Sequence, residues 1–574
     1  MKDSFVNKPE RPWPNPYLEV ASIVGHTTAE NSRLWFRTHT PGRYQVLVFS
    51  LLEIESEEID QKLGQNQLTL EKLTGLKAGS PDAYSLQVYK LTTGDSSDTT
   101  GVVDVENLKP DTRYRYLLWS EERAMPVLGH QRPLIFKTFS DRVKPISFGF
   151  FSCHMPYKTT LFGRTKAVNE EMWDYFGEML KRHNEKDLRF VLAGGDQVYS
   201  DGVETLSIWN FLKKVMRRDG DTLFPEVGEM VSWYRDIYRG YWGFPSVREV
   251  YSSFPMYMIW DDHEIGDGWG SFRLNGGKRR DELDEILPNR EDSQLSYEDR
   301  AKLVSRMFEA AKQVYREYQH SHNPDMRKTD TFFPADAYDY SINFPAGALY
   351  VLDGRGQRDF NRRSYKVLGK EQFQRFSDWL EGLDLDTTPF VFVASAVPMV
   401  HLSHVLVDQG EGIIADAVNI TDDLRDGWEH PAHKMENRRL LKALFKAARK
   451  GHRVCVLSGD VHVAAAFRLS DPDSQAIIYQ LTSSAITYNQ SRALGWALGK
   501  AVPDDGKTRD GYEFKRLARY TDSNFSLIRV DPEKDLVDFQ LYGEQVTHDP
   551  ENEAAHYNSH SIAKIELSFP KIEK

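Results

Sequence analysis

A change of pattern near residue 144 constrains the fold of this chain more than any other feature. Beyond it, strand-like apolar runs alternate with amphipathic helical segments, which is typical of an α/β domain. The expected strands are ISFGFF (146–151), LRFVLA (188–193), PMYMIW (255–260), ALYVL (348–352), PFVFVA (389–394) and RVCVL (453–457). The tail from about residue 475 returns to strands. We therefore expect two mixed sheets packed as a sandwich, with helices outside.

Three segments of this region carry apolar residues at helical spacing. They are marked by Met172, Trp173, Phe176, Met179 and Leu180, by Leu303, Met307, Ala311 and Tyr315, and by Leu440, Leu441, Leu444 and Phe445. Gly451 is expected to end the third helix. Segments 204–250, 276–300 and 405–436 are long, charged and aromatic, so we expect them to form loops or helical insertions over a site.

Residues 1–142 are expected to form an all-β module, followed by the larger α/β domain over residues 143–574. The short β-rich runs are LEVASIV (18–24), RLWFRT (33–38), RYQVLVFS (43–50), GVVDVEN (101–107) and PLIFKTF (133–139). A turn before alternating Tyr114 and Tyr116 resembles the tyrosine-corner strand of fibronectin-type-III sandwiches. The polar segment 53–83 is expected to be a surface insertion.

Composition excludes several classes of function. The 574 residues carry a formal net charge of −12, so we expect no specific nucleic-acid binding, which needs a broad cationic surface. Two cysteines exclude a disulfide framework. We find no apolar run of about 18 residues and expect no membrane span. The N-terminal residues include neither a signal-like apolar stretch nor a twin arginine, which predicts a cytoplasmic location.

Polar residues follow four of the predicted strands, at the point where each strand ends. They are Cys153 and His154, then Asp196, Tyr199 and Asp201, then Asp261, Asp262, His263 and Glu264, and finally Asp460 and His462. Ligands bind at the carboxyl ends of strands in open α/β sheets, so these side chains are expected to converge. Oxygen, nitrogen and thiolate donors together favour a dinuclear metal site.

This series resembles the motifs of the calcineurin-like metallophosphatases, and its details resemble the alkaline phosphatase D (PhoD-like) family. The matching segments are Cys153, GDQVY (195–199), DDHE (261–264) and GDVH (459–462). LDGRGQR (352–358) and DGWEHPAHKMENRRLL (426–441) are looser matches. The resemblance implies a metallophosphatase-like two-sheet sandwich flanked by helices, with an N-terminal β module. In the superfamily a further His ligand precedes the last motif, and here His401 and His404 are the candidates.

The resemblance also implies metal ligands. Asp196 would bridge two metals, while Cys153, Tyr199 and His462 would complete the shell of the first. Phenolate and thiolate together favour Fe³⁺ at that position. Asp262 and Asp460 would bind the second metal, and their oxygen atoms suit Ca²⁺ or Mg²⁺ better than Zn²⁺, with Mn²⁺ also possible. The family is associated with iron and calcium, so the expected site is dinuclear or trinuclear.

The expected reaction is hydrolysis of phosphate esters by a hydroxide that the metals hold. His263, paired with Glu264, would protonate the leaving oxygen. Arg355 and His154 are candidates for gripping the phosphate. Two of these residues have equally plausible structural roles, His154 as an ordinary hydrogen-bonded histidine and Arg355 as the ion-pair partner of Asp353 or Asp359. Asp261 and Asp201 would be ligands or would support ligands.

The leading hypothesis is therefore a PhoD-like phosphoric ester hydrolase. Small phosphomonoesters are the first expected substrates, with diesters or phospholipid-type esters as the alternative. A different hypothesis is a catalytically inactive metallophosphatase-fold protein that acts in binding or as a scaffold. A third is a metal hydrolase that cleaves a bond other than a phosphate ester.

Overall fold

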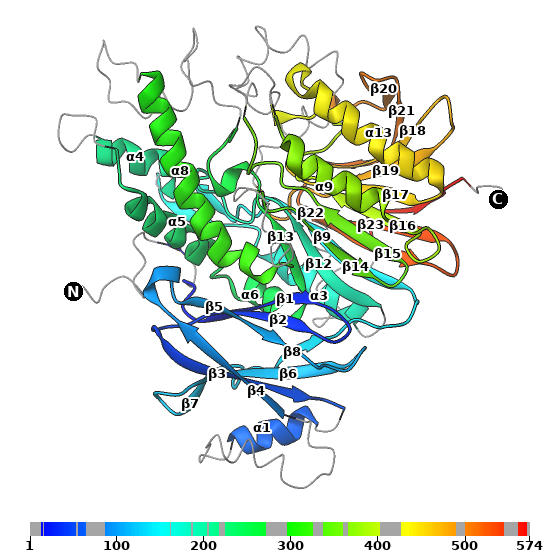
Figure 1. The fold of residues 1–574 in the computed structure, drawn as a ribbon. Coiled ribbons are helices and arrows are strands. Elements are labelled where there is room, and N and C mark those ends of the chain that lie inside the picture. The colour runs from blue at the N-terminus through cyan, green and yellow to red at the C-terminus, as the bar shows by residue number, and fades with distance from the viewer. Residues whose placement is uncertain are drawn as a thin grey trace.

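The computed structural model describes two parts, a larger α/β body and a smaller β module beneath it (Figure 1). Among the described residues no helix combines the length and apolar character needed to cross a bilayer. The described residues are 13–14, 17–52, 55–64, 86–160, 162–184, 187–203, 206–216, 224–270, 296–324, 337–359, 366–401, 426–488, 500–544 and 561–570.

The first sheet of the body has the order β13-β12-β9-β22-β23-β24. Its strands are β9 (Ile146–Phe151), β12 (Leu188–Gly194), β13 (Met256–Ile259), β22 (Asn524–Asp531), β23 (Leu536–Gly543) and β24 (Ala563–Leu567). β9, β12 and β13 run parallel, so their carboxyl ends lie along one edge. β22 pairs antiparallel to β9, and β23 and β24 follow, each antiparallel to the strand before it.

The second sheet has the order β14-β15-β16-β17-β19-β18-β21-β20. Its strands are β14 (Tyr340–Phe344), β15 (Gly347–Val351), β16 (Phe390–Ala394), β17 (Arg453–Ser458), β18 (Ala464–Ser470), β19 (Ile477–Thr482), β20 (Asp505–Lys507) and β21 (Glu513–Tyr520). The four strands β15, β16, β17 and β19 are parallel, and antiparallel strands close both edges. A separate hairpin consists of β10 (Tyr157–Thr159) and β11 (Thr165–Ala167).

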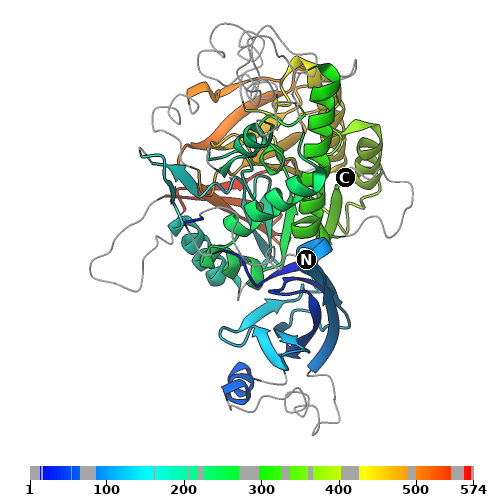
Figure 2. The same ribbon diagram turned by 90° about the vertical axis from the view of Figure 1, so that its left-hand side faces the viewer.

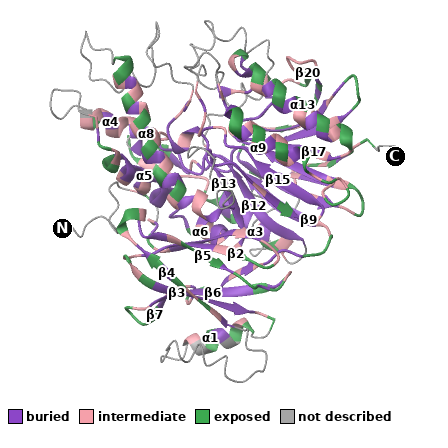
Figure 3. Ribbon diagram, viewed as in Figure 1, coloured by how far each residue is buried: buried purple, intermediate pink, exposed green. Residues whose placement is uncertain are grey.

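The two sheets pack face to face around an apolar core, and their strands are largely buried (Figure 3). Phe148 of β9 and Phe392 of β16 meet edge to face with ring centroids 5.2 Å apart. The other face of the second sheet is covered by α9 (Gly369–Glu381) and α13 (Lys434–Lys450). α3 (Glu171–Asn184) packs on the first sheet.

Further helices lie beside the sheets: α4 (Ile208–Met216), α5 (Val227–Tyr241), α6 (Pro245–Ser253) and α8 (Tyr297–Tyr318), with the short 3₁₀ turns η4 (Asp262–Glu264), η5 (His320–His322) and η7 (Pro431–His433). Local signals fix several ends. Ser296 caps α8 by accepting a hydrogen bond from the Asp299 amide, and Gly451 ends α13 with φ 108°.

The N-terminal module is a small sandwich that lies below the body in the second view (Figure 2). One sheet is β1 (Ala21–Thr27), β2 (Ser32–Arg37) and β5 (Thr100–Val105). The other is β4 (Leu86–Thr93), β3 (Gly42–Ser50), β6 (Arg113–Ser120) and β7 (Met125–Leu128), with β8 (Leu134–Lys137) paired to β6. α1 (Ser56–Gly64) and η2 (Asp95–Ser97) complete it.

A tyrosine corner stabilises this module, as its sequence predicts. The Tyr114 hydroxyl accepts a hydrogen bond from the Lys109 amide at 2.7 Å, five residues upstream. Tyr116, two residues on, instead reaches the body and donates to the Ser252 carbonyl oxygen at 2.7 Å. Tyr114 therefore stabilises the module itself, whereas Tyr116 binds the module to the body.

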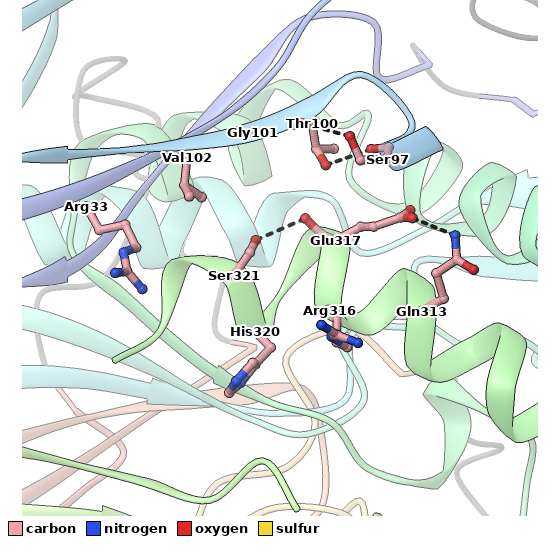
Figure 4. Close-up of a pocket in the computed structure, with 10 residues that line it drawn as sticks. All are labelled: Arg33, Ser97, Thr100, Gly101, Val102, Gln313, Arg316, Glu317, His320 and Ser321. Carbon is pink, nitrogen blue, oxygen red and sulfur yellow. Dashed lines mark hydrogen bonds between the residues drawn. The ribbon is translucent and has the colours of Figure 1, made fainter. Parts of the chain in front are cut away.

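The junction also contains a cavity of about 540 Å³ between β2, η2 and β5 on one side and the end of α8 with η5 on the other (Figure 4). Arg33 binds Asp104, and Glu317 binds Arg235 and Gln313. Arg33, Gln313 and Glu317 are therefore already bonded to protein partners. The cavity lies away from the strand ends that carry the predicted metal ligands.

The expected fold class is confirmed: two mixed sheets, flanking helices and an N-terminal β module. Segment 204–250 holds α4, α5 and α6, in line with helical insertions. The strands β4, β7, β10, β11, β14, β18, β20 and β21 were not expected. The division at residue 142 stays a prediction, because Ile23 and Trp35 of the module share one apolar core with the body.

Candidate metal centre

The four strand ends meet at one place, as their order in the sheets requires. β9, β12 and β13 are neighbours in the first sheet, and β17 brings the fourth set of residues from the second sheet. The amide of Cys153 donates to the Gly195 carbonyl at 3.1 Å, and the amide of His154 donates to the Asp196 carbonyl at 2.8 Å. These backbone bonds fix the loop after β9 against the loop after β12.

The backbone at these ends is held in an unusual conformation. Cys153, Asp196, Asp460 and His462 have φ values of 58°, 57°, 67° and 51°, in the left-handed region that non-glycine residues rarely adopt. Each such residue costs about 1–3 kcal/mol, and these conformations cluster at functional sites. Gly195, with φ 115°, lets the loop after β12 approach Asp261 closely, since a Cβ at residue 195 would lie only 2.8 Å from the Cβ of Asp261.

One group of donors surrounds the Asp196 carboxylate. Its Oδ2 lies 3.4 Å from the Cys153 Sγ and 3.4 Å from the Tyr199 hydroxyl. The Tyr199 hydroxyl in turn lies 3.0 Å from His462 Nε2. The structure therefore brings a thiol, a phenol, an imidazole and a carboxylate together. This is the set that the sequence predicts for the first metal.

Burial affects the protonation of this group strongly. It raises the pKa of the Cys153 thiol well above its ordinary value, and the nearby Asp196 carboxylate adds to the effect. Burial and the same neighbours raise the pKa of Tyr199. Burial and the nearby His263 lower the pKa of His462 to about 3, which leaves its imidazole in the neutral form that binds metals. A cation at this point would reverse the shifts on the thiol and the phenol.

A second group consists of four carboxylates, Asp196, Asp261, Asp262 and Asp460, whose ligand atoms all lie within 4.8 Å of one another. Burial, followed by mutual repulsion, raises the pKa of Asp460 well above its ordinary range. Burial raises the pKa of Asp261 to about 7, with Arg355 opposing the rise and Asp262 adding to it. The protein alone thus opposes the ionisation of these groups.

Three oxygens of this carboxylate group are buried without a hydrogen-bond partner: Asp196 Oδ1, Asp261 Oδ2 and Asp262 Oδ1. An unsatisfied buried acceptor costs about 1–3 kcal/mol, so three together need an explanation. Hard oxygen donors of this kind suit Ca²⁺ or Mg²⁺. The residues present therefore fit a centre with one mixed-donor position and one all-oxygen position, joined by Asp196.

His263 lies beside the centre, but its partner differs from the expected one. Its Nδ1 is 2.7 Å from Asp201 Oδ1, and its ring stacks on Tyr199 with centroids 4.0 Å apart. Burial alone would lower its pKa, but Asp201 and Asp262 raise it well above the ordinary value. The expected pairing with Glu264 is wrong, because Asp201, two residues beyond Tyr199, takes that place.

Glu264 instead holds backbone together. Its Oε2 accepts hydrogen bonds from the amides of Asp196 and Asp261, at 3.1 and 2.8 Å. Its Oε1 accepts from the amide of Gln197 at 2.7 Å and from the Gln319 side chain at 2.9 Å. With all four bonds directed to protein groups, this carboxylate acts by positioning two strand ends.

Arg355 is also committed to carboxylates. Its guanidinium is wholly buried, binds Asp261 and Asp426, and lies 3.4 Å from Asp262 Oδ1. Its remaining donor reaches the Trp269 carbonyl at 3.0 Å. Arg355 belongs to the segment LDGRGQR and Asp426 to DGWEHP, so this ion pair joins the two looser motif segments. The expected grip on phosphate is not supported, and neither Asp353 nor Asp359 is its side-chain partner.

His154 points away from the centre. Its Nδ1 lies 2.9 Å from the Thr487 hydroxyl and 3.0 Å from the Trp173 indole nitrogen, and its Nε2 lies 3.1 Å from the Tyr241 carbonyl. Burial lowers the pKa of this imidazole to about 3. Of the two interpretations left open by the sequence, the hydrogen-bonded histidine is the one supported.

Several residues at the centre were given no firm role from sequence. Tyr488 stacks on His462 with ring centroids 3.5 Å apart, and no motif includes it. Asp267 joins Asp201 and His263 in a further group of possible ligands. His401 is buried near His462, as its influence on the pKa of that imidazole indicates. His404 lies outside the described residues.

Comparison with known proteins now adds to this geometry. The sequence model of the PhoD-like phosphatase family matches residues 148–535, more than half of the chain. The chain belongs to the PhoD-like phosphatase family. The matched region contains every residue of the candidate metal centre, from Cys153 to His462.

Two further proteins are similar to this chain, one in structure and one in sequence. The solved structure of PhoD superposes with a TM-score of 0.57 at 15% identity, over 92% of this chain and 87% of that one, which supports the shared fold. An uncharacterized protein of Saccharomyces cerevisiae is 24% identical over 335 residues, which cover 51% of this chain and 47% of the yeast protein. The alignment thus spans about half the length of this curated relative.

Proposed function

We propose that this protein is a metal-dependent phosphoesterase whose centre is formed by Cys153, Asp196, Tyr199, Asp262, Asp460 and His462, with Asp261 as an additional carboxylate. Small phosphomonoesters are the first proposed substrates and phosphodiesters the second. One observation carries the proposal more than any other. Four buried carboxylates converge, three of their oxygens lack a hydrogen-bond partner, and Arg355 and His263 are the basic side chains beside them.

The proposal follows from the cost of buried charge. Buried carboxylates are normally paired, hydrogen-bonded or bound to metals, because desolvation strongly disfavours an isolated ion. Arg355 divides its donors among Asp261, Asp262 and Asp426, Arg358 also binds Asp426, and His263 lies near Asp196 and Asp262. These basic groups are fewer than the carboxylates around them. A pair of cations would balance the remainder. This charge excess argues against an inactive scaffold, for which such a cluster would only lower stability.

The two positions would take different metals. Cys153, Tyr199 and His462 offer thiolate, phenolate and imidazole, which suit Fe³⁺, and Asp196 would be shared. Asp261, Asp262 and Asp460 offer only oxygen, which suits Ca²⁺, with Mg²⁺ or Mn²⁺ as substitutes. Bound metals would supply Lewis acidity toward phosphate oxygens and lower the pKa of water.

A side chain of the protein, His263, would supply the proton that the leaving oxygen needs. Asp201 holds His263 through Nδ1, which leaves Nε2 as the atom that can give a proton to the leaving oxygen. Stacking on Tyr199 fixes the plane of the ring. Glu264 and Arg355 keep the strand ends and carboxylates in register, so that Asp196 and Asp261 stay in place without rearrangement.

Replacement of Cys153 by alanine tests this proposal directly. Cys153→Ala should lose iron, lose the visible absorption of a phenolate–iron pair and lose hydrolysis of p-nitrophenyl phosphate. Cys455→Ala is the matched control, because Cys455 is equally buried but lies inside β17. Retention of both iron and activity by Cys153→Ala would remove the thiolate from the centre.

A panel of substrates then separates the candidate reactions. Hydrolysis of p-nitrophenyl phosphate or of bis-p-nitrophenyl phosphate by metal-loaded protein supports a phosphoesterase and ranks monoesters against diesters. Turnover of carboxylic or sulfate esters with neither phosphate substrate would assign the centre to a different metal hydrolase. Full metal loading without turnover of any ester would favour the scaffold hypothesis.

A further inference from the structure

A small hairpin leaves the body directly after the metal centre. β10 and β11 pair with each other and with no other strand of the described chain. The base is anchored, since Tyr157 is buried and donates to the Gly240 carbonyl at 2.7 Å. The turn is closed by a hydrogen bond from the Thr160 amide to the Arg164 carbonyl at 2.8 Å. The hairpin is therefore a defined element with its outer half in solvent.

The tip of this hairpin carries Phe162, whose side chain is 91% exposed. The next most exposed large apolar side chain in the described part of the molecule is Leu52, at 65%. A single exposed apolar residue is common on protein surfaces and says little alone. The neighbours of Phe162 make its position informative.

Three cations accompany Phe162 on the hairpin: Lys158, Arg164 and Lys166, all exposed. Lys158 and Lys166 are direct cross-strand partners, and like charges in this position destabilise a hairpin. None of the three forms an ion pair with any described residue of the chain. The whole chain has a net charge of −12, so this positively charged cluster is opposite in sign to the chain as a whole. The contacts within the fold do not account for it.

We propose that the β10–β11 hairpin docks on an anionic membrane surface, with Phe162 in the headgroup boundary and the three cations on lipid phosphates. An aromatic residue combined with basic residues is the combination that binds such interfaces, and each cation near the surface adds to the affinity. The strands are three residues long. They are too small to form the roughly 800 Å² per partner of a stable protein interface.

Docking in this way has a consequence for the metal centre. Cys153 and Tyr157 are four residues apart, and four extended residues span at most about 14 Å. A docked hairpin would hold the centre close to the lipid surface. The proposal goes beyond the phosphoesterase activity, because a protein without turnover would dock equally well.

Vesicle sedimentation tests the proposal. We expect the protein to bind vesicles of phosphatidylcholine mixed with phosphatidylglycerol, to bind pure phosphatidylcholine vesicles far less, and to release as NaCl is added. Reversing the three charges (Lys158→Glu, Arg164→Glu, Lys166→Glu) should weaken binding by roughly 100-fold or more, at about fivefold per cation. Phe162→Ser should weaken it by about 10-fold or more.

Matched controls lie on the N-terminal module. Leu52→Ser removes another exposed apolar side chain, and Lys90→Glu, Arg113→Glu and Arg123→Glu together reverse three other exposed cations. Both controls should bind as the unchanged protein does. All variants should hydrolyse a water-soluble ester at the unchanged rate, which separates this proposal from the phosphoesterase proposal.

Three results would overturn the lipid assignment. The first is equal binding to both kinds of vesicle or to neither. The second is unchanged vesicle binding by the hairpin variants. The third is binding to a single-stranded oligonucleotide without vesicle binding, which would assign the cations to a different polyanion.

Discussion

Two regions of this chain treat buried carboxylates in opposite ways. At the junction between the β module and the body, Asp98 binds Arg37 and Arg239 and accepts a hydrogen bond from the Tyr318 hydroxyl. Burial alone would raise the pKa of Asp98, but Arg37 and Arg239 outweigh it and lower the pKa below its ordinary value. This carboxylate is matched by protein groups and needs nothing else.

At the metal centre, burial also acts first, but the neighbours do not compensate for it. The pKa of Asp196 is raised well above its ordinary range, with nearby Asp262 adding to burial and His263 opposing it. The contrast shows how a structural cluster can be told from a ligand-binding one. The junction balances its charges within the chain, whereas the candidate metal centre has an excess of carboxylates that we propose metals balance.

The largest expected effect comes from the carboxylate shared by both metal positions. Asp196→Asn should abolish binding of both metals and lower kcat by about 10⁴-fold or more, because metals supply several kcal/mol of transition-state stabilisation. Metal analysis and steady-state kinetics check this. After removal of metals by a chelator, the same substitution should leave thermal stability unchanged or raise it, because burial and the neighbouring carboxylates already disfavour the charged form of Asp196. A large loss of stability in the metal-free protein would contradict the contrast.

His263→Ala should lower kcat by about 10²–10⁴-fold, most for substrates with poor leaving groups, because it removes the proton donor. Metal content should stay unchanged. His39→Ala, at a half-exposed position on the β module, is the control and should have no effect. Loss of metal on replacement of His263 would show that this residue is a ligand and not the acid.

Asp98→Asn should destabilise the protein by about 3–5 kcal/mol, because it leaves Arg37 and Arg239 buried without a counter-charge. Asp111→Asn is the matched control, since Asp111 binds Lys137 and Lys144 near the surface and should cost about 1 kcal/mol or less. Chemical unfolding at neutral pH measures both. An equal cost at the two positions would contradict the account of the junction.

The pH dependence of that difference follows from the lowered pKa of Asp98. A carboxylate with a lowered pKa in the folded state stabilises the protein above its ordinary value of 3.8, and the contribution is lost as the pH falls toward the folded-state value. The gap in unfolding free energy between the unchanged protein and Asp98→Asn should therefore narrow below about pH 4. A gap independent of pH would be inconsistent with an ionised Asp98.

The smallest effect is expected at Glu264, which holds the centre without touching substrate. Glu264→Gln replaces one acceptor oxygen by an amide donor that faces backbone N–H groups, so Asp196 or Asp261 should shift. We expect a 10–100-fold loss in metal affinity or kcat, as is typical for groups that orient metal ligands. Glu178→Gln, on the exposed face of α3, is the control. Unchanged metal affinity and kcat would show that the bonds to Glu264 are dispensable.

How far the sequence predicts the site depends on whether contacts are local. Cys153, Asp196, Tyr199, Asp262, Asp460 and His462 were predicted because each follows a recognisable buried strand. Partners distant in the chain were not. Arg355 binds Asp426 across 71 positions, and the His263 ring is paired with Asp201 across 62. Neither pairing leaves a periodic signal in the sequence.

The same distinction applies to the fold. α3, α8 and α13 were expected because a buried stripe repeats every three to four residues. β21 was missed because one of its faces is exposed to solvent. Its sequence, EFKRLARY, is therefore rich in charged residues and does not look like a buried strand. Its strand conformation comes from pairing with β18, which is a tertiary contact.

Elemental analysis of protein purified without chelators, together with its visible spectrum, tests the central claim most directly. The account predicts about one iron and one or two calcium ions per chain, with a phenolate-to-iron absorption band. Zinc or manganese pairs without such a band would keep a hydrolase but contradict the thiolate–phenolate iron position. A protein that holds no metal, even after reconstitution, would contradict the claim that the buried carboxylates form a metal centre.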